Sequence, residues 1–288
     1  MPKIDVNGLA IDYELIGDEG GPPLVLTPGG RYPRDTAGVP ELGAKLAEGG
    51  YRVLLWDRPG CGASDIAFTA PSESVMNCEA LVGLIDALSF RNVTLVGGSA
   101  GSRITLMAAA RQPANVRQIA IWWISGGPVG LAGLAWFYCG DQIAAASKGG
   151  MEAVVQLPSW ADQIARNPRI RSILMAQDPD AYIATMQRWG KAFAYSDESP
   201  VPGMTAQDFA RLTMPVLTFR SGKSDMAHTR ETSEWVHRLL PNSTLVEPPW
   251  GDQEWNCVST FPVDPANRRG RFERWPLLAP LLLDWLKA

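Results

Sequence analysis

The sequence predicts an α/β protein with a mostly parallel central sheet, helices on both faces of the sheet, and an inserted helical cap. Strand and helix patterns alternate as far as residue 127 and again from residue 213, and such alternation builds a parallel sheet covered on both sides. The intervening residues 128–212 contain helical pieces and no clear strand. We therefore expect a core formed by 1–127 and 213–288 and a cap, or lid, formed by 128–212.

The composition limits the classes of function. A chain of 288 residues is long enough for one large domain with an insertion, and its net charge of −4 argues against nucleic acid as a partner. The N-terminus has no apolar leader, and no stretch of about 18 apolar residues could span a membrane. We expect a soluble cytoplasmic protein with no membrane partner, and the composition is compatible with a homo-oligomer.

The cysteines and histidines do not form a metal motif. The four cysteines lie far apart without a C-x-x-C pair, and the chain has only two histidines. Reduced thiols and no metal site are the expectation. The cysteines are Cys61, Cys78, Cys139 and Cys257.

The chain begins with strand patterns. Residues 9–15 alternate apolar and polar side chains after an Asn-Gly turn, which is typical of a hairpin. Residues 24–27 form a short apolar strand that runs into the sequence Pro-Gly-Gly-Arg at 28–31. A glycine pair at a strand end is often only a turn. Beside a strand that carries a nucleophile, it is also where a backbone N–H could stabilise an oxyanion.

The middle of the core continues the alternation. A helix over 42–47 and a strand over 53–56 lead into the turn-rich loop 57–65, in which Asp57 and Arg58 are expected to tie the backbone through charge-assisted hydrogen bonds. Helical spacing follows over 74–89, and an apolar strand over 93–96.

The remaining strands and helices of the core lie on both sides of the expected cap. Strands are expected over 118–124, 215–219 and 244–246. Helices are expected over 229–240 and 276–286.

The segment 95–102 carries the pattern G-x-S-x-G between a strand and a helix. A serine in this pattern sits on a strained turn, where the small Gly97 and Gly101 allow close backbone approach and the hydroxyl is exposed above the sheet. The N–H of Ala100, at the start of the helix, can stabilise a developing oxyanion. Ser99 is the candidate nucleophile.

The order of these parts resembles the α/β-hydrolase family over nearly the whole chain. The matching features are the glycine loop at 28–30, the D-R-P-G-x-G-x-S loop at 57–64, the serine turn, the cap, and S-G-K-S-D at 221–225. The resemblance, which extends to esterases, lactonases and C–C bond hydrolases, implies Ser99 as nucleophile, the N–H groups of Gly30 and Ala100 as oxyanion hole, and Asp225 as the acid. It implies no metal or organic cofactor.

The expected histidine after the last strand is missing. That position reads Glu-Pro-Pro-Trp-Gly-Asp-Gln-Glu-Trp at 247–255, and no histidine follows His237. His237 lies in an apparent helix and is interpreted as structural, so His228 is the candidate base. We expect Asp252 or Glu254 to orient His228, because a triad is a geometry that different chain orders can meet. Asp225 is the alternative, although a separation of three residues in a tight turn makes the ring-to-carboxylate hydrogen bond difficult.

The substrate is expected to be small and apolar or aromatic. The chain has eleven tryptophans, many of them at strand ends or in the cap, and Trp123, Trp136 and Trp250 are candidates for substrate binding. Core packing is the alternative interpretation of most of these aromatic residues. Arg31 beside the glycine loop could pair with a substrate carboxylate.

Three functions remain open from the sequence. The first is a serine hydrolase that cleaves an ester, lactone or activated C–C bond with His228 as base. The second is a ligand-binding or sensing protein that has lost the base, and it predicts binding without acylation of the serine. The third is a non-hydrolytic lyase, which predicts activity that survives loss of the Ser99 hydroxyl.

Overall fold

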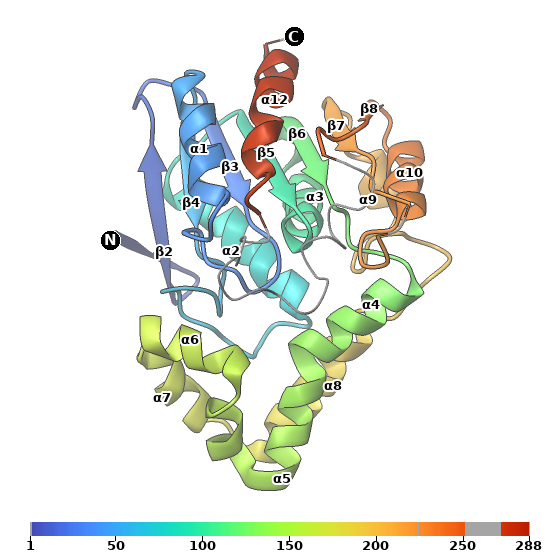
Figure 1. The fold of residues 1–288 in the computed structure, drawn as a ribbon. Helices are drawn as coiled ribbons and strands as arrows, with labels where there is room; N and C mark the ends of the chain where they lie inside the picture. Colours follow the sequence, from blue (N-terminus) through green and yellow to red (C-terminus); the bar gives the residue numbers. More distant parts are fainter. Residues whose placement is uncertain (1, 224, 251–271, 288) are drawn as a thin grey trace.

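The computed structural model describes residues 2–223, 225–250 and 272–287 and has an eight-stranded sheet at its centre (Figure 1). The strand order is β1-β2-β4-β3-β5-β6-β7-β8, with antiparallel pairing at β1 and β2 and parallel pairing from β4 through β8. The predicted fold class is confirmed. The strands are β1 (Lys3–Val6), β2 (Leu9–Ile16), β3 (Pro23–Thr27), β4 (Arg52–Trp56), β5 (Val93–Gly98), β6 (Val116–Trp122), β7 (Val216–Phe219) and β8 (Ser243–Val246).

The N-terminal hairpin forms as its turn residues predict. Asn7 and Gly8 both have positive φ, 54° and 80°, as the two central residues of a tight hairpin turn require. β1 then pairs antiparallel with β2, and β2 pairs antiparallel with β4. The hairpin therefore closes one edge of the parallel sheet.

Helices cover both faces of the sheet because its central strands are apolar on both sides. α2 (Glu73–Ala87), α3 (Ala100–Arg111) and α10 (Arg230–Leu239) contribute to one buried cluster. α1 (Val39–Glu48), the 3₁₀ helix Trp275–Leu278 and α12 (Ala279–Leu286) contribute to the cluster on the opposite face. A short 3₁₀ helix, Pro113–Asn115, precedes β6.

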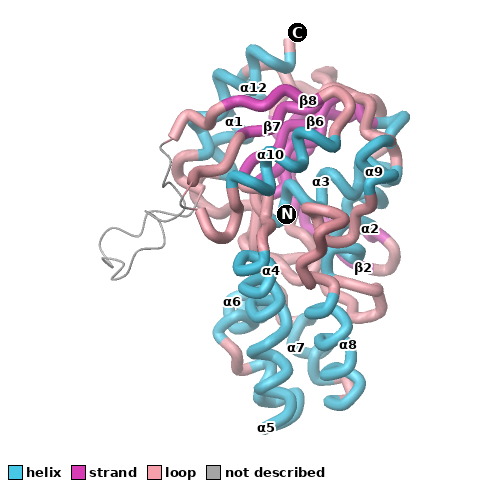
Figure 2. The backbone as a smooth tube through the Cα atoms, turned by 90° about the vertical axis from the view of Figure 1, so that its right-hand side faces the viewer, coloured by secondary structure: helices cyan, strands magenta, loops and turns pink. Residues whose placement is uncertain are grey.

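The segment between β6 and β7 is helical and has its own apolar cluster, which includes Tyr138, Trp160 and Trp189. Figures 1 and 2 show α4 to α8 grouped beyond one end of the sheet. The helices are α4 (Pro128–Ala135), the π-helical turn Trp136–Gly140, α5 (Asp141–Val155), α6 (Pro158–Arg166), α7 (Arg169–Met175), α8 (Pro179–Lys191) and α9 (Ala206–Ala210). Phe209 of α9 packs into the core cluster on the α3 face, so the end of this segment rejoins the core.

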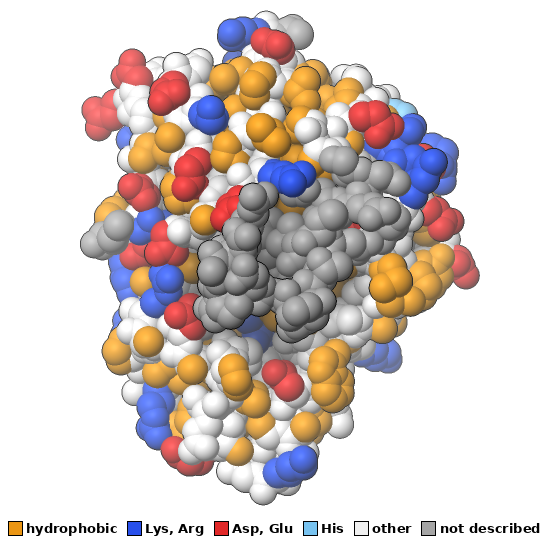
Figure 3. Space-filling model, viewed as in Figure 1, with side chains coloured by type: hydrophobic (Ala, Val, Ile, Leu, Met, Phe, Trp, Pro, Cys, Tyr) orange, Lys and Arg blue, Asp and Glu red, His pale blue; other side chains and the backbone are white. Residues whose placement is uncertain are grey.

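Polar contacts tie this helical segment to the core. Asn167 donates a hydrogen bond to buried Asp65 at 2.9 Å, and the indole of Trp189 donates to the carbonyl of Ala70, also at 2.9 Å. On the face seen in Figure 3, acidic and basic side chains are interspersed. Within the described ranges, every helix is too short or too polar to cross a membrane.

Candidate active site

Ser99 occupies a strained turn between β5 and α3. Its φ is 57°, which is uncommon for a residue with a side chain. The turn depends on glycine, because a Cβ on Gly101 would lie 2.1 Å from the Thr27 oxygen and one on Gly97 would lie 2.7 Å from the Gly101 carbonyl carbon. The two glycines therefore permit the turn that places Ser99 at the carboxyl end of β5.

Ser99, His228 and Asp225 form a continuous hydrogen-bonded relay. The Ser99 Oγ lies 2.9 Å from the His228 Nε2, and the His228 Nδ1 lies 3.1 Å from the Asp225 Oδ2. All three side chains are buried, with exposed fractions of 6%, 2% and 5%. With the Nδ1 proton directed at the carboxylate, Nε2 is the acceptor for the serine hydroxyl.

Asp225 reaches His228 even though only two residues separate them. Its Oδ1 accepts hydrogen bonds from the backbone N–H of Ala227 at 3.0 Å and of His228 at 2.9 Å, which folds the loop into a compact Asx turn. That turn brings Oδ2 to the imidazole of His228. The expectation that this spacing makes the bond difficult is therefore wrong. Asp252 and Glu254, the other candidate orienters, lie outside the described residues.

Two predicted substrate-binding tryptophans lie behind the histidine. The Trp123 ring stacks on the His228 ring, with centroids 6.0 Å apart and an interplanar angle of 25°. Trp250 packs against Trp123 at 5.3 Å. Both tryptophans are at least 90% buried, so the contact of Trp123 with His228, backed by Trp250, restricts the orientation of the histidine ring.

The glycine loop after β3 is held by Arg58. The Arg58 Nη2 donates a hydrogen bond to the Gly29 carbonyl at 3.1 Å and another to the Gly30 carbonyl. Because the N–H and C=O of a trans peptide point in opposite directions, the Gly30 N–H points away from Arg58. Asp57 also ties its loop as expected, by accepting hydrogen bonds from the backbone N–H groups of Arg34 and Ala63.

Ala100 supplies a second candidate oxyanion donor. It is the first residue of α3, so its N–H belongs to the unpaired donors at the helix N-terminus. Gly30 follows β3 and Ala100 follows β5, and these strands are adjacent and parallel. The two N–H groups predicted to form the oxyanion hole therefore come from the ends of neighbouring strands, one from the glycine loop and one from the Ser99 turn itself.

A cavity of about 140 Å³ opens in front of Ser99 and His228. Its wall is mainly apolar and includes Tyr32 and Phe272, together with Leu134 and Phe137 from the helical segment between β6 and β7. Trp136 is 65% exposed and is not among the residues that line this cavity. The helical segment therefore contributes an aromatic side chain to the cavity through the next residue, Phe137, which the sequence did not single out for substrate contact.

Arg31 contacts the helical segment between β6 and β7. Its guanidinium lies 4.7 Å from the centroid of the Trp160 ring, and its Nη2 donates a hydrogen bond to the Tyr138 carbonyl at 3.1 Å. It is not among the residues that line the 140 Å³ cavity. These contacts fix the residue that follows the glycine loop against the helical segment.

A buried ion pair lies one helical turn beyond the serine. Arg103 of α3 lies 3.4 Å from Glu73 of α2 and donates a hydrogen bond to Ser74 at 2.8 Å, with both charged side chains at least 94% buried. The pair joins the two helices on one face of the sheet.

Glu73→Ala is expected to lower the free energy of unfolding by about 3–5 kcal/mol, because it leaves the Arg103 charge buried without its partner. Urea denaturation measures this change. Glu79→Ala on the same helix is the control, since Glu79 pairs with Arg111 at the surface and its loss should cost at most about 1 kcal/mol. Equal losses in the two variants would contradict the interpretation.

The described thiols are poor alternative nucleophiles. Burial raises the pKa of Cys61 and Cys78 to about 11 and that of Cys139 to about 12. They therefore remain protonated near neutral pH, whereas a nucleophilic cysteine needs its thiolate. The described residues also contain no cluster of His, Cys, Asp or Glu able to hold a metal ion.

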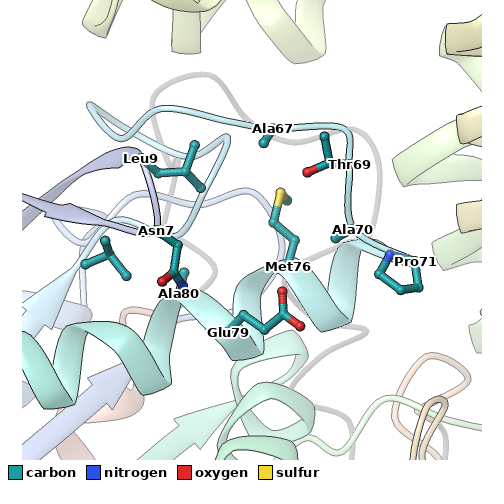
Figure 4. Close-up of a pocket in the computed structure, with 10 residues that line it drawn as sticks. Asn7, Leu9, Ala67, Thr69, Ala70, Pro71, Met76, Glu79 and Ala80 are labelled. Atoms are coloured by element: carbon teal, nitrogen blue, oxygen red, sulfur yellow. The ribbon is translucent and has the colours of Figure 1, made fainter.

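A larger cavity of about 260 Å³ lies elsewhere, between the N-terminal hairpin, the loop before α2 and α2 itself (Figure 4). Its only ionisable lining residue is Glu79, which already pairs with Arg111. Among the described residues that line this cavity, none is a nucleophile with an adjacent base, in contrast to the cavity at Ser99.

A sequence model described as the alpha/beta hydrolase family matches residues 24–282. The chain belongs to this family. Its relatives include the human protein named Serine hydrolase BPHL, which is 25% identical over 84% of this chain and 76% of its own length. Another relative, a 2-hydroxy-6-oxo-6-phenylhexa-2,4-dienoate hydrolase from Comamonas testosteroni, is 30% identical over 44% of this chain and 43% of its own length.

Solved structures share the fold of the whole chain. The 2-hydroxy-6-oxo-6-phenylhexa-2,4-dienoate hydrolase from Rhodococcus has a TM-score of 0.64 and 21% identity, covering 99% of this chain and 98% of its own. The enol-lactonase from Burkholderia xenovorans has a TM-score of 0.61 and 19% identity, covering 100% of both chains. The relatives and neighbours named here are hydrolases, so the hydrolase class predicted for this chain is confirmed.

Proposed function

We propose that this alpha/beta hydrolase cleaves an ester, lactone or activated C–C bond through an acyl-enzyme formed on Ser99. The observation that carries the proposal is the relay from Ser99 to His228 at 2.9 Å and from His228 to Asp225 at 3.1 Å, beside a cavity at the carboxyl end of the sheet. A nucleophile, a base and a group that orients the base are the parts that such catalysis requires.

In the proposed reaction, His228 accepts the Ser99 proton as Oγ attacks the substrate carbonyl. The N–H groups of Gly30 and Ala100 stabilise the oxyanion of the tetrahedral intermediate. His228 then protonates the leaving group, and the C–X bond breaks to give the acyl-enzyme. A water molecule attacks the acyl carbon, passes a proton to His228, and releases the acid as Ser99 recovers its proton. Asp225 holds the imidazole in the required tautomer and stabilises its protonated form.

The cavity supports a small substrate with an apolar or aromatic part. Tyr32, Phe137 and Phe272 present aromatic groups beside Ser99 and His228. Relatives and structural neighbours include proteins named as a 2-hydroxy-6-oxo-6-phenylhexa-2,4-dienoate hydrolase and an enol-lactonase. We infer the same general class of substrate for this chain.

Acid quenching during turnover of 4-nitrophenyl acetate, followed by mass spectrometry, tests the acyl-enzyme directly. The wild-type protein should gain one acetyl group, located on the peptide that contains Ser99. Ser99→Ala should show no acetylation of that peptide and no burst of nitrophenol, because the attacking oxygen is gone.

The alternatives predict different results. Turnover that persists in Ser99→Ala without an acyl adduct in the wild type would indicate the lyase interpretation. Ligand binding by a wild-type protein that is neither acylated nor active would indicate a binding protein. Either result would contradict the proposed hydrolase mechanism.

A further inference from the structure

A second serine lines the cavity in front of Ser99 and His228. Ser125 follows β6, is 2% exposed, and is one of the cavity's lining residues. Its Oγ has no hydrogen-bond partner among the residues that the structure describes. Since buried hydroxyl groups are normally paired, this one is expected to have its partner in whatever occupies the cavity.

The sheet order places Ser125 on the histidine side of the nucleophile. β6 lies between β5, which carries Ser99, and β7, which precedes the His228 loop, whereas the glycine loop follows β3 on the other side of β5. The N–H of Gly126, next to Ser125, donates a hydrogen bond to the carbonyl of Ala227 at 3.3 Å. Ser125 is therefore anchored beside the residue that precedes the base, on the opposite side of β5 from the glycine loop.

We propose that Ser125 is a further catalytic residue whose hydroxyl hydrogen-bonds the leaving group during acylation and the attacking water during deacylation. This inference rests on the proposed function. His228 exchanges its proton with both of these groups, so they occupy the same place in turn. The water gives one proton to His228 and donates its other O–H to the Ser125 Oγ. These two contacts orient a lone pair of the water oxygen toward the acyl carbon. A C–O bond forms to this water, the bond to Ser99 Oγ breaks, and His228 returns the proton to Ser99.

Ser221 provides a matched control. It follows β7, the next strand of the sheet, is 1% exposed, and its Oγ also has no hydrogen-bond partner among the described residues. It lines a different cavity, with Arg220, Glu247 and Trp250. Ser221→Ala therefore removes a comparable hydroxyl from a neighbouring strand end without touching the cavity at Ser99.

The test uses 4-nitrophenyl acetate and measures kcat together with the fraction of enzyme acylated at saturation, which gives the acylation and deacylation rate constants separately. Ser125→Ala is expected to slow deacylation about 10-fold, the effect of losing one hydrogen bond to the reacting water. Acylation should change less than about 3-fold, because 4-nitrophenolate leaves without needing a proton. Ser125→Thr, which keeps a hydroxyl, should stay within about 3-fold of wild type in deacylation, and Ser221→Ala should change neither step.

Several results would overturn the inference. These are an unchanged deacylation rate in Ser125→Ala, an equal loss in both steps, an equal loss in Ser221→Ala, or no recovery in Ser125→Thr. If Ser125→Ala does not fold, Ser125→Gly enters the same measurement. Failure of the wild-type protein to form any acyl-enzyme would instead count against the proposed function, so the two failures are distinguishable.

Discussion

Replacing His228 with glutamine is expected to lower kcat for ester hydrolysis by about a million-fold. Glutamine keeps a polar side chain of similar length but cannot accept the serine proton near neutral pH. Without the base, the Ser99 hydroxyl is a poor nucleophile, and single loss of the histidine in a serine protease triad has about this effect. Steady-state kinetics with 4-nitrophenyl acetate measures the change.

His237→Gln is the matched control for this prediction. His237 is the other histidine of the chain, lies on α10, and has its Nδ1 3.0 Å from the Ser243 Oγ on β8. Its replacement should keep kcat within about 3-fold of wild type, because no reacting group lies beside it. If His228→Gln kept more than about 1% of wild-type kcat while folded, the assignment of His228 as base would be wrong.

Asp225→Asn is expected to lower kcat by about ten thousand-fold with little change in structure. An asparagine carbonyl can still accept the backbone N–H groups of Ala227 and His228, so the turn is retained. The amide group, however, presents a donor to His228 Nδ1. The imidazole then carries its proton on Nε2 and cannot accept the one from Ser99, which is the known consequence of this exchange in a triad. Kinetics and circular dichroism together check this outcome.

Asp252→Asn and Glu254→Gln separate the two candidate arrangements of the relay. Both carboxylates lie outside the described residues, and the sequence favoured one of them as the group that orients His228. Because Asp225 already contacts the Nδ1 atom, we expect each of these variants to retain kcat within about 3-fold. A loss in either variant as large as in Asp225→Asn would instead support orientation of His228 by the carboxylate replaced in that variant.

The fold was predictable because its signals are local. Apolar strands, helical spacing and the Asn-Gly turn are each recognisable in a short stretch of sequence. The bounds of the observed strands and helices agree with the predicted ones within a few residues. The Ser99 turn was predictable for the same reason, since Gly97 and Gly101 are needed where backbone atoms approach within 3 Å of their Cβ positions. His228 could be found because the chain has only two histidines.

The partner of His228 was harder to predict because it depends on one side chain making two kinds of contact. Asp225 uses one oxygen to shape the backbone and the other to bind the ring, and the spacing alone does not reveal this. The signal that could have indicated it is the tendency of aspartate to accept N–H groups from the next residues in a turn.

The aromatic and polar lining of the cavity depends on tertiary packing. Trp136 and Phe137 are adjacent in a π-helical turn, and of the two only Phe137 lines the cavity. The spacing of apolar residues along the sequence does not show which of two neighbours faces a cavity. Ser125 stands before two glycines at a strand end, where a serine is ordinarily a turn residue. The role that we propose for Ser125 depends on the position of β6 beside β5 in the sheet, which is a feature of the tertiary structure.

The rate at which a fluorophosphonate labels Ser99 tests the central claim most directly, because labelling requires the nucleophile and its base but no particular substrate. We expect wild-type protein to be labelled on the Ser99 peptide, Ser99→Ala to remain unlabelled, and His228→Gln to be labelled at least about a thousand-fold more slowly. Labelling of folded His228→Gln at the wild-type rate would contradict the relay from Asp225 through His228 to Ser99.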